Sequence, residues 1–313
     1  MKQRQFDPLN LTYHFKPLFL GSGVWGEGCS LLLATAMLTG TIAPLLASSL
    51  SPLPVMAQTT TQAEELLEYG LEAGRNRDWD AAIAHWNQGL AIYRELGDRP
   101  QEAQLLYLIG RAFKNKQDDD RAAEFLQASL NQFVELGNRQ AQTEVLFYLG
   151  QTHRELGNVN RAIEFLESSL TLAREFQNLS RVAETLYELS ESYLEIGDID
   201  RALRYLEQGL ALAIELDDRT REASITYKFS LVYSQLQQYN RAIGWLDRTL
   251  TIAREIDDRS AEATTLLALG ITYAKIGETD VARVTLEDSL EIATATDDRD
   301  LIGRIQTEID SLP

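Results

Sequence analysis

Apolar side chains recur along the chain at the spacing of an amphipathic helix, in paired stretches separated by short polar breaks. One first stretch runs through Leu186, Leu189 and Tyr193 and ends at the break Gly197-Asp198. Its second stretch runs through Ala202, Leu203, Leu206, Leu210 and Ala213. Spacings of three and four residues place such side chains on one face of a helix. The pattern therefore predicts two helices joined by a tight turn.

This paired unit repeats with a period of 40 residues. Alanine holds one position in every copy: Ala82, Ala122, Ala162, Ala202, Ala242 and Ala282. Leucine holds a second position, and a small residue always precedes it: Gly89, Ser129, Ser169, Gly209, Thr249 and Ser289. Six copies in register are typical of a solenoid. The small residues predict a close helix crossing that leaves no room for bulk.

Two further repeat positions carry short polar side chains near the expected turns. The first series is Asp80, Asp120, Asn160, Asp200, Asn240 and Asp280, and the second is Asp98, Asn138, Asn178, Asp218, Asp258 and Asp298. A side-chain oxygen at such a place can accept a hydrogen bond from a free amide at the start of a helix. Both series are therefore predicted to cap, or nearly cap, the helices.

The repeat resembles the tetratricopeptide repeat. The family's pattern stands in the last copy as Leu266, Leu269, Gly270, Tyr273, Gly277, Ala282, Leu286 and Ser289. The 40-residue period is similar to the long subtype of kinesin light chain, LGN-type scaffolds and many bacterial arrays. The resemblance covers about residues 58–297 and implies an all-α fold, an α-α superhelix of six helix hairpins.

We expect the repeat domain to occupy residues 58–313. Its six copies should lie at about 62–97, 101–137, 140–177, 180–217, 220–257 and 260–297. Residues 299–312 have no partner helix and should form a C-terminal capping helix.

The charge of this domain limits its partners. Of the 313 residues, 29 are Lys or Arg and 47 are Asp or Glu; residues 58–313 hold 26 and 45 of them, a net charge of −19. We expect no nucleic-acid partner, because phosphate binding needs basic surfaces.

Cysteine is absent from residues 58–313, and the histidines there are His85 and His153. We therefore expect no metal, no cofactor and no catalytic site.

Residues 1–57 have the pattern of a leader. Basic residues near the start precede the apolar run Leu31–Leu50, and small residues, Val55 and Ala57, follow it. This order predicts a secretory signal peptide cleaved after Ala57 and an exported protein, periplasmic or extracellular. Twenty apolar residues can also span a bilayer, so an uncleaved membrane anchor at Leu31–Leu50 is the alternative.

The resemblance also implies a binding site. In tetratricopeptide arrays the first helices line a concave groove that receives an extended peptide or a helix. One position on successive first helices holds Tyr107, Phe147, Tyr187 and Tyr227. Residues four and seven positions later share their face: Arg111, Lys114, Gln151, Arg154, Glu191 and Leu231. These ten are the candidate groove residues, and the groove should run from basic to acidic to apolar.

Two alternatives stay open at this point. The four aromatic rings could instead pack between adjacent first helices and expose only an edge. The function implied is a non-catalytic scaffold that binds a protein or peptide, and the alternative is a regulatory sensor that controls a separate effector enzyme.

The leader gives the first testable prediction. Amino-terminal sequencing of the protein from its native source should read Gln58 as the first residue, because the Val55-Met56-Ala57 segment fits a signal peptidase. A mature protein that still contains Leu31–Leu50 would favour the membrane anchor instead.

Overall fold

The computed structural model describes residues 55–313, with side chains from residue 59. All of them belong to one compact unit, Leu53–Pro313. The predicted signal peptide or anchor lies outside the described residues, apart from its last three positions. Cleavage after Ala57 stays a prediction. Among residues 55–313, no helix is both long enough and apolar enough to cross a membrane.

The described part of the chain folds into thirteen helices and no strand, which confirms the all-α prediction. They are α1 (Val55–Arg75), α2 (Trp79–Leu96), α3 (Arg99–Asn115), α4 (Asp119–Glu135), α5 (Arg139–Glu155), α6 (Val159–Glu175), α7 (Leu179–Glu195), α8 (Ile199–Glu215), α9 (Arg219–Gln235), α10 (Tyr239–Glu255), α11 (Arg259–Lys275), α12 (Thr279–Ala295) and α13 (Arg299–Ser311).

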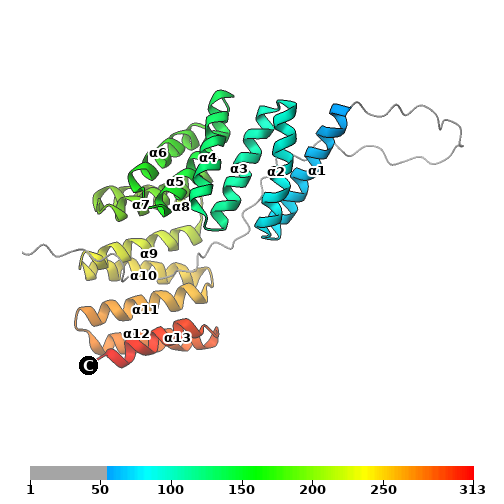
Figure 1. Cartoon of the computed structure of the whole chain (residues 1–313). Helices are drawn as coiled ribbons and strands as arrows, with labels where there is room; N and C mark the ends of the chain where they lie inside the picture. The colour runs from blue at the N-terminus through cyan, green and yellow to red at the C-terminus, as the bar shows by residue number, and fades with distance from the viewer. Residues whose placement is uncertain (1–54) are drawn as a thin grey trace, which may run out of the picture. The chain divides into compact units, whose positions relative to one another are not determined.

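The helices form six hairpins, each with an odd-numbered first helix and an even-numbered second helix. Each second helix also packs against the first helix of the next hairpin. Figure 1 shows the hairpins stacked in chain order, with α13 beside α12 at the end of the array. Helix α13 buries Leu301 and Ile305 and thereby covers the last hairpin.

The polar series divide between two helix positions. The second series are N-caps: the carboxylate of Asp98, for example, accepts a hydrogen bond from the amide of Gln101 at 3.2 Å. The first series lies two residues past the N-cap, and Asp118, not Asp120, caps α4. The second series therefore caps its helices, and the first series lies near the cap, in the first turn. At that position the carboxylates of Asp80, Asp120, Asp200 and Asp280 are stabilised by the helix dipole.

The turns between helices all use one backbone conformation. The residue before each N-cap has a positive φ, as at Gly157 (74°) and Gln117 (60°). The next amide then bonds to the carbonyl five residues back, as Asp118 does with Phe113 at 3.0 Å. Glycine adopts this left-handed conformation without strain, which explains why it recurs there.

The hairpins are held by close crossings, as the small residues predicted. All six repeat alanines are fully buried. A Cβ placed on Gly150 of α5 would lie 2.5 Å from Cγ of Leu166 on α6, and Gly110 and Gly270 meet Leu126 and Leu286 in the same way. In these three hairpins the leucine of the second helix therefore fits against bare backbone of the first helix.

Some of the small residues also bond across the hairpin. The hydroxyl of Ser129 donates to the carbonyl of Ala103 at 2.8 Å. Ser169 and Ser289 make the equivalent bonds to Thr143 and Ala263. The small side chain thus both permits the close crossing and satisfies a buried hydroxyl.

A glycine pair tests the crossing. Gly150→Ala should lower the free energy of unfolding by about 1–3 kcal/mol, because the added methyl overpacks the contact with Leu166. Gly244→Ala is the matched control: its Cβ would meet no atom within 4 Å, and it should raise the free energy by about 1 kcal/mol through helix propensity. Urea unfolding measures both, and equal effects would contradict the crossing.

Candidate binding surface on the first helices

One face of the first helices is left half-buried by the packing of the hairpins, except at Leu108, which is buried. In each of α3, α5, α7, α9 and α11 it comprises four positions spaced four, three and three residues apart, which is one face of a helix. We call this the first-helix face. It consists of Gln104, Leu108, Arg111 and Lys114; Glu144, Tyr148, Gln151 and Arg154; Glu184, Glu188, Glu191 and Leu194; Ser224, Lys228, Leu231 and Ser234; and Thr264, Ala268, Ile271 and Ala274.

The predicted aromatic ladder is mostly buried. Tyr107, Phe147 and Tyr227 are 8%, 5% and 8% exposed, and Tyr187 is half-buried. Tyr148 contacts both Tyr107 and Phe147, with ring centroids 5.8 and 5.4 Å apart. The alternative left open by the sequence therefore describes these rings better: they pack between adjacent first helices and do not form a continuous exposed ladder.

The residue that follows each ladder position along the helix is the one that faces the surface. Consecutive residues point about 100° apart around a helix, so the side chain after each aromatic turns onto the first-helix face. These residues are Tyr148, Glu188, Lys228 and Ala268, which are half-buried, whereas the equivalent Leu108 of α3 is 6% exposed and packs in the core. Sequence reasoning missed them. The signal was their strong variation from copy to copy, which is typical of a position that packing does not constrain.

The predicted residues four and seven positions after each aromatic do lie on the first-helix face, and several meet across neighbouring helices. The amide of Gln151 donates to Glu188 at 2.7 Å, joining α5 to α7. The ammonium of Lys228 lies 3.0 Å from Glu191, joining α9 to α7. These contacts show that adjacent first helices present their side chains to one shared surface.

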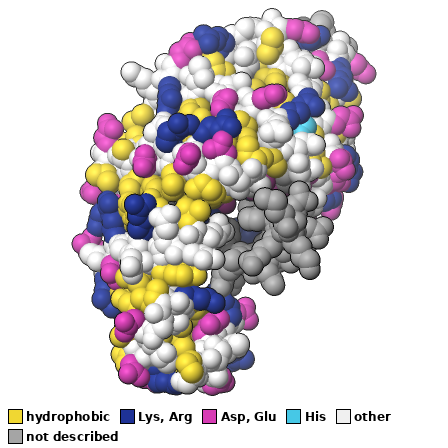
Figure 2. Space-filling view, turned by 90° about the vertical axis from the view of Figure 1, so that its left-hand side faces the viewer, with side chains coloured by type: hydrophobic (Ala, Val, Ile, Leu, Met, Phe, Trp, Pro, Cys, Tyr) yellow, Lys and Arg dark blue, Asp and Glu magenta, His cyan; other side chains and the backbone are white. Residues whose placement is uncertain are grey.

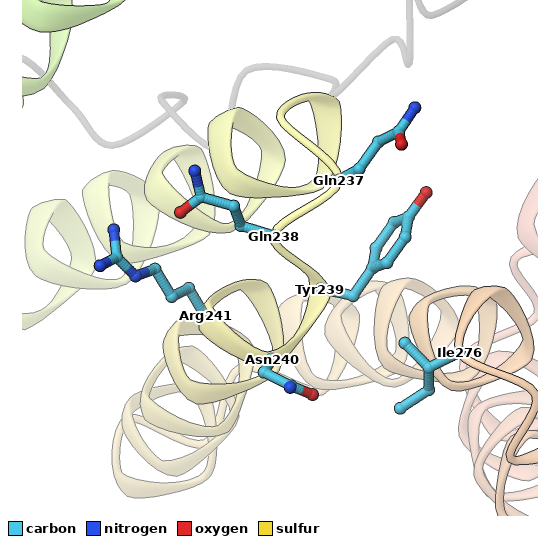
Figure 3. A pocket seen from close by; sticks show the side chains of 6 residues that line it. All are labelled: Gln237, Gln238, Tyr239, Asn240, Arg241 and Ile276. Atoms are coloured by element: carbon cyan, nitrogen blue, oxygen red, sulfur yellow. The ribbon is translucent and has the colours of Figure 1, made fainter.

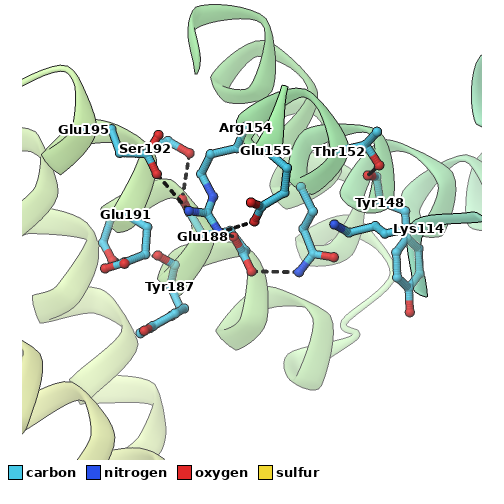
Figure 4. A network of polar contacts seen from close by, with 12 residues as sticks. Lys114, Tyr148, Thr152, Arg154, Glu155, Tyr187, Glu188, Glu191, Ser192 and Glu195 are labelled. Atoms are coloured by element: carbon cyan, nitrogen blue, oxygen red, sulfur yellow. Dashed lines mark hydrogen bonds and ion pairs between the residues drawn. The ribbon is translucent and has the colours of Figure 1, made fainter. Parts of the chain in front are cut away.

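Arg154 is the centre of the largest network on this surface (Figure 4). Its guanidinium donates to Glu195 at 2.8 Å and lies 3.3 Å from a carboxylate oxygen of Glu188 and 3.4 Å from Glu155. Burial alone disfavours the charged guanidinium, but the three carboxylates outweigh it and raise the pKa of Arg154. Burial raises the pKa of Glu188, and Arg154 and Gln151 offset this only in part.

A second polar group surrounds Tyr148. The guanidinium of Arg181 lies 4.0 Å from the ring centroid of Phe147 and forms ion pairs with Glu144 and Glu184. The guanidinium of Arg111 lies 4.7 Å from the ring centroid of Tyr148 and 5.3 Å from that of Tyr107. Arg181 is a further residue that the sequence did not single out.

The surface changes character along the array. Helix α3 contributes two cations, α7 three carboxylates, and α11 no charged side chain but Ala268, Ile271 and Ala274. The carboxylates of α7 are paired with Arg181, Arg154 and Lys228. The acidic section on α7 is thus neutralised locally. The face therefore differs most in character between its basic end on α3 and its apolar end on α11.

The repeats match a known family. The model of the tetratricopeptide repeat matches residues 67–137, 139–215 and 221–295. The chain belongs to the tetratricopeptide repeat family. Repeats of this family suggest a protein-interaction scaffold. No curated protein matches the sequence significantly.

Solved structures of tetratricopeptide proteins share the fold. BtubC (BKLC) from P. vanneervenii is 18% identical with a TM-score of 0.58, over 76% of this chain and 92% of that one. The quorum sensor NprR from B. thuringiensis is 15% identical with a TM-score of 0.60, over 83% and 71%. A putative kinesin light chain from Podosopora anserina is 16% identical with a TM-score of 0.54, over 62% and 95%. At these identities the likeness shows the fold alone.

Other parts of the described tetratricopeptide array offer less chemistry. A pocket at the turn between α9 and α10 is lined by Gln237, Gln238, Tyr239, Asn240, Arg241 and Ile276 (Figure 3). Arg241 is the one charged side chain among them, and it lies over the ring of Tyr233.

In residues 55–313 no group of three metal-ligating side chains is placed to hold an ion. On the face drawn in Figure 2, exposed apolar side chains lie between acidic and basic ones.

The buried carboxylate gives a prediction on pH. The pKa of Glu188 is higher in the folded chain than the ordinary 4.5. Ionisation of Glu188 therefore destabilises the fold as pH rises from about 4.5 through the folded pKa. Glu188→Gln removes this loss, so its free energy of unfolding relative to the wild type should be greater at pH 8 than at pH 5.5. Urea titrations at both values measure it; the opposite trend would mean that Arg154 outweighs burial.

Proposed function

We propose that this protein is a non-catalytic scaffold that binds an extended segment of a protein or peptide along the first-helix face. The observation that carries the proposal is the continuity of that face over α3, α5, α7, α9 and α11. Its residues other than Leu108 are half-buried, because the second helices of the described hairpins pack on the other side. In the family the first helices line a concave groove, and the same placement is proposed here.

The chemistry of the face supports binding rather than catalysis. Its carboxylates on α5 and α7 are held in ion pairs with Arg and Lys, as Glu188 is with Arg154 and Glu191 with Lys228. Each of these carboxylates is thereby engaged by a cation of the protein itself. Such pairs do give a surface a defined shape and charge for a partner.

The leader supports a location outside the cytoplasm. We propose that the scaffold is exported after cleavage near Ala57, or is held at the membrane by Leu31–Leu50 if the leader is retained. Its net charge of −19 over residues 58–313 supports a protein partner over a nucleic acid.

Two of the proteins with similar structures are sensors, namely the quorum sensor NprR and the tetratricopeptide sensor of a signal transduction ATPase from Pyrococcus horikoshii. The latter shares 13% identity with a TM-score of 0.70 and is covered over only 39% of its length. The hypothesis of a regulatory sensor rests on these two proteins, with which the chain shares the fold alone, whereas the scaffold hypothesis rests on the first-helix face itself. We therefore propose the scaffold.

A double substitution at the apolar end tests the proposal. Leu231→Gln with Ile271→Gln should reduce partner capture by the full chain about tenfold, because buried aliphatic contact is lost. The fold should persist, since the same repeat position already holds Arg111, Gln151 and Glu191. Partner bound from the native extract is quantified beside a circular dichroism spectrum.

The matched control lies on a second helix. Val281→Gln with Val284→Gln changes two aliphatic side chains of α12 that are 43% and 58% exposed. It should leave capture unchanged. If capture falls equally in both double variants, or in neither, the first-helix face is not the binding surface.

A further inference from the structure

Arg111 differs from the other cations of the first-helix face and its border. Lys114 lies 3.8 Å from Asp119, Lys228 pairs with Glu191, and Arg154 and Arg181 each pair with more than one carboxylate. Among the described residues, no carboxylate lies within ion-pairing distance of Arg111. Its charge is therefore the one on this face that the described hairpins do not neutralise directly.

The site around Arg111 is nevertheless built. The guanidinium lies over the rings of Tyr107 and Tyr148, which come from different hairpins, and its Nε is buried without a hydrogen-bond partner. The two rings fix the plane of the guanidinium, which is the geometry that receives a carboxylate through two parallel hydrogen bonds. Burial disfavours the charged guanidinium and Glu144 acts on it only from beyond ion-pairing distance, so an incoming anion would add the direct contact that is lacking.

The apolar end of the first-helix face indicates that the partner also carries apolar side chains. Leu231 and Ile271 are half-buried aliphatic residues on α9 and α11. Three helix spacings of about 10 Å separate α3 from α9, or about 30 Å. An extended chain covers that distance with about nine residues, and the further spacing to Ile271 on α11 with about three more.

We propose that Arg111 receives the side-chain carboxylate of an Asp or Glu in an extended partner segment, whose apolar side chains lie over Leu231, about nine residues away, and over Ile271, about three residues further. This inference rests on the proposed function and specifies the partner of the same face. The net charge of −19 repels acidic peptides in general. A preference for one acidic residue would therefore reflect a local receptor and not the overall field.

Selection from a library of displayed random 14-residue peptides on the full chain tests the proposal. The peptides are joined to the display protein at their carboxyl ends, so an enriched carboxylate belongs to a side chain. The wild type should enrich Asp or Glu at one position and apolar residues about nine positions away. Arg111→Gln should lose the acidic preference and keep the apolar one. Arg204→Gln, the same change at an exposed residue of α8, should keep both.

A selected peptide then serves as a synthetic probe. Replacing its acidic residue with the matching amide should weaken binding to the wild type about tenfold or more and leave binding to Arg111→Gln unchanged. The peptide substitution tests the carboxylate on unaltered protein, whatever the stability of the Arg111 variant.

The two ideas fail in different ways. If peptides bind the first-helix face without an acidic preference, or with one that Arg111→Gln leaves intact, the receptor is wrong and the scaffold stands. If no peptide binds, or if Leu231→Gln with Ile271→Gln leaves binding of the selected peptide intact, the proposed function is wrong as well.

Discussion

Each hairpin depends on the contact between two helices at positions with little or no side chain. The repeat alanines are fully buried, and the backbone of Gly150 receives Leu166 so closely that one methyl group would not fit. Because this contact fixes how the two helices cross, it also fixes which face of the first helix is covered and which is left over. The first-helix face is thus a consequence of the packing on the opposite side.

The same surface carries much of the bonding between neighbouring hairpins. Gln151, Arg154 and Lys228 each reach a carboxylate on a neighbouring first helix. Such bridges orient one hairpin against the next. They also pair charges within the protein that a partner could otherwise contact. A charged residue on this face is therefore available for recognition only where its charge is not already paired, and this singles out Arg111 over Arg154.

Burial of these polar groups sets a limit on how the face can change. Glu188 is held by Arg154 and Gln151 although burial raises its pKa. Removing one member of such a group leaves the others desolvated, whereas replacing a lone cation such as Arg111 disturbs ring contacts only. The array can thus vary its recognition residues at the basic and apolar ends more freely than in its centre.

The sequence by itself determined the helix hairpins, their number, the close crossings and the family, because a six-fold repeat of small and large residues is compatible with one way of packing. It also placed Arg111, Gln151, Glu191 and Leu231 on one face. Only the tertiary structure decided that Tyr107 and Phe147 pack inward and that Tyr148 and Glu188 are presented. The reason is rotational: a shift of one residue turns a side chain by about 100°, and only the contact between hairpins fixes that angle.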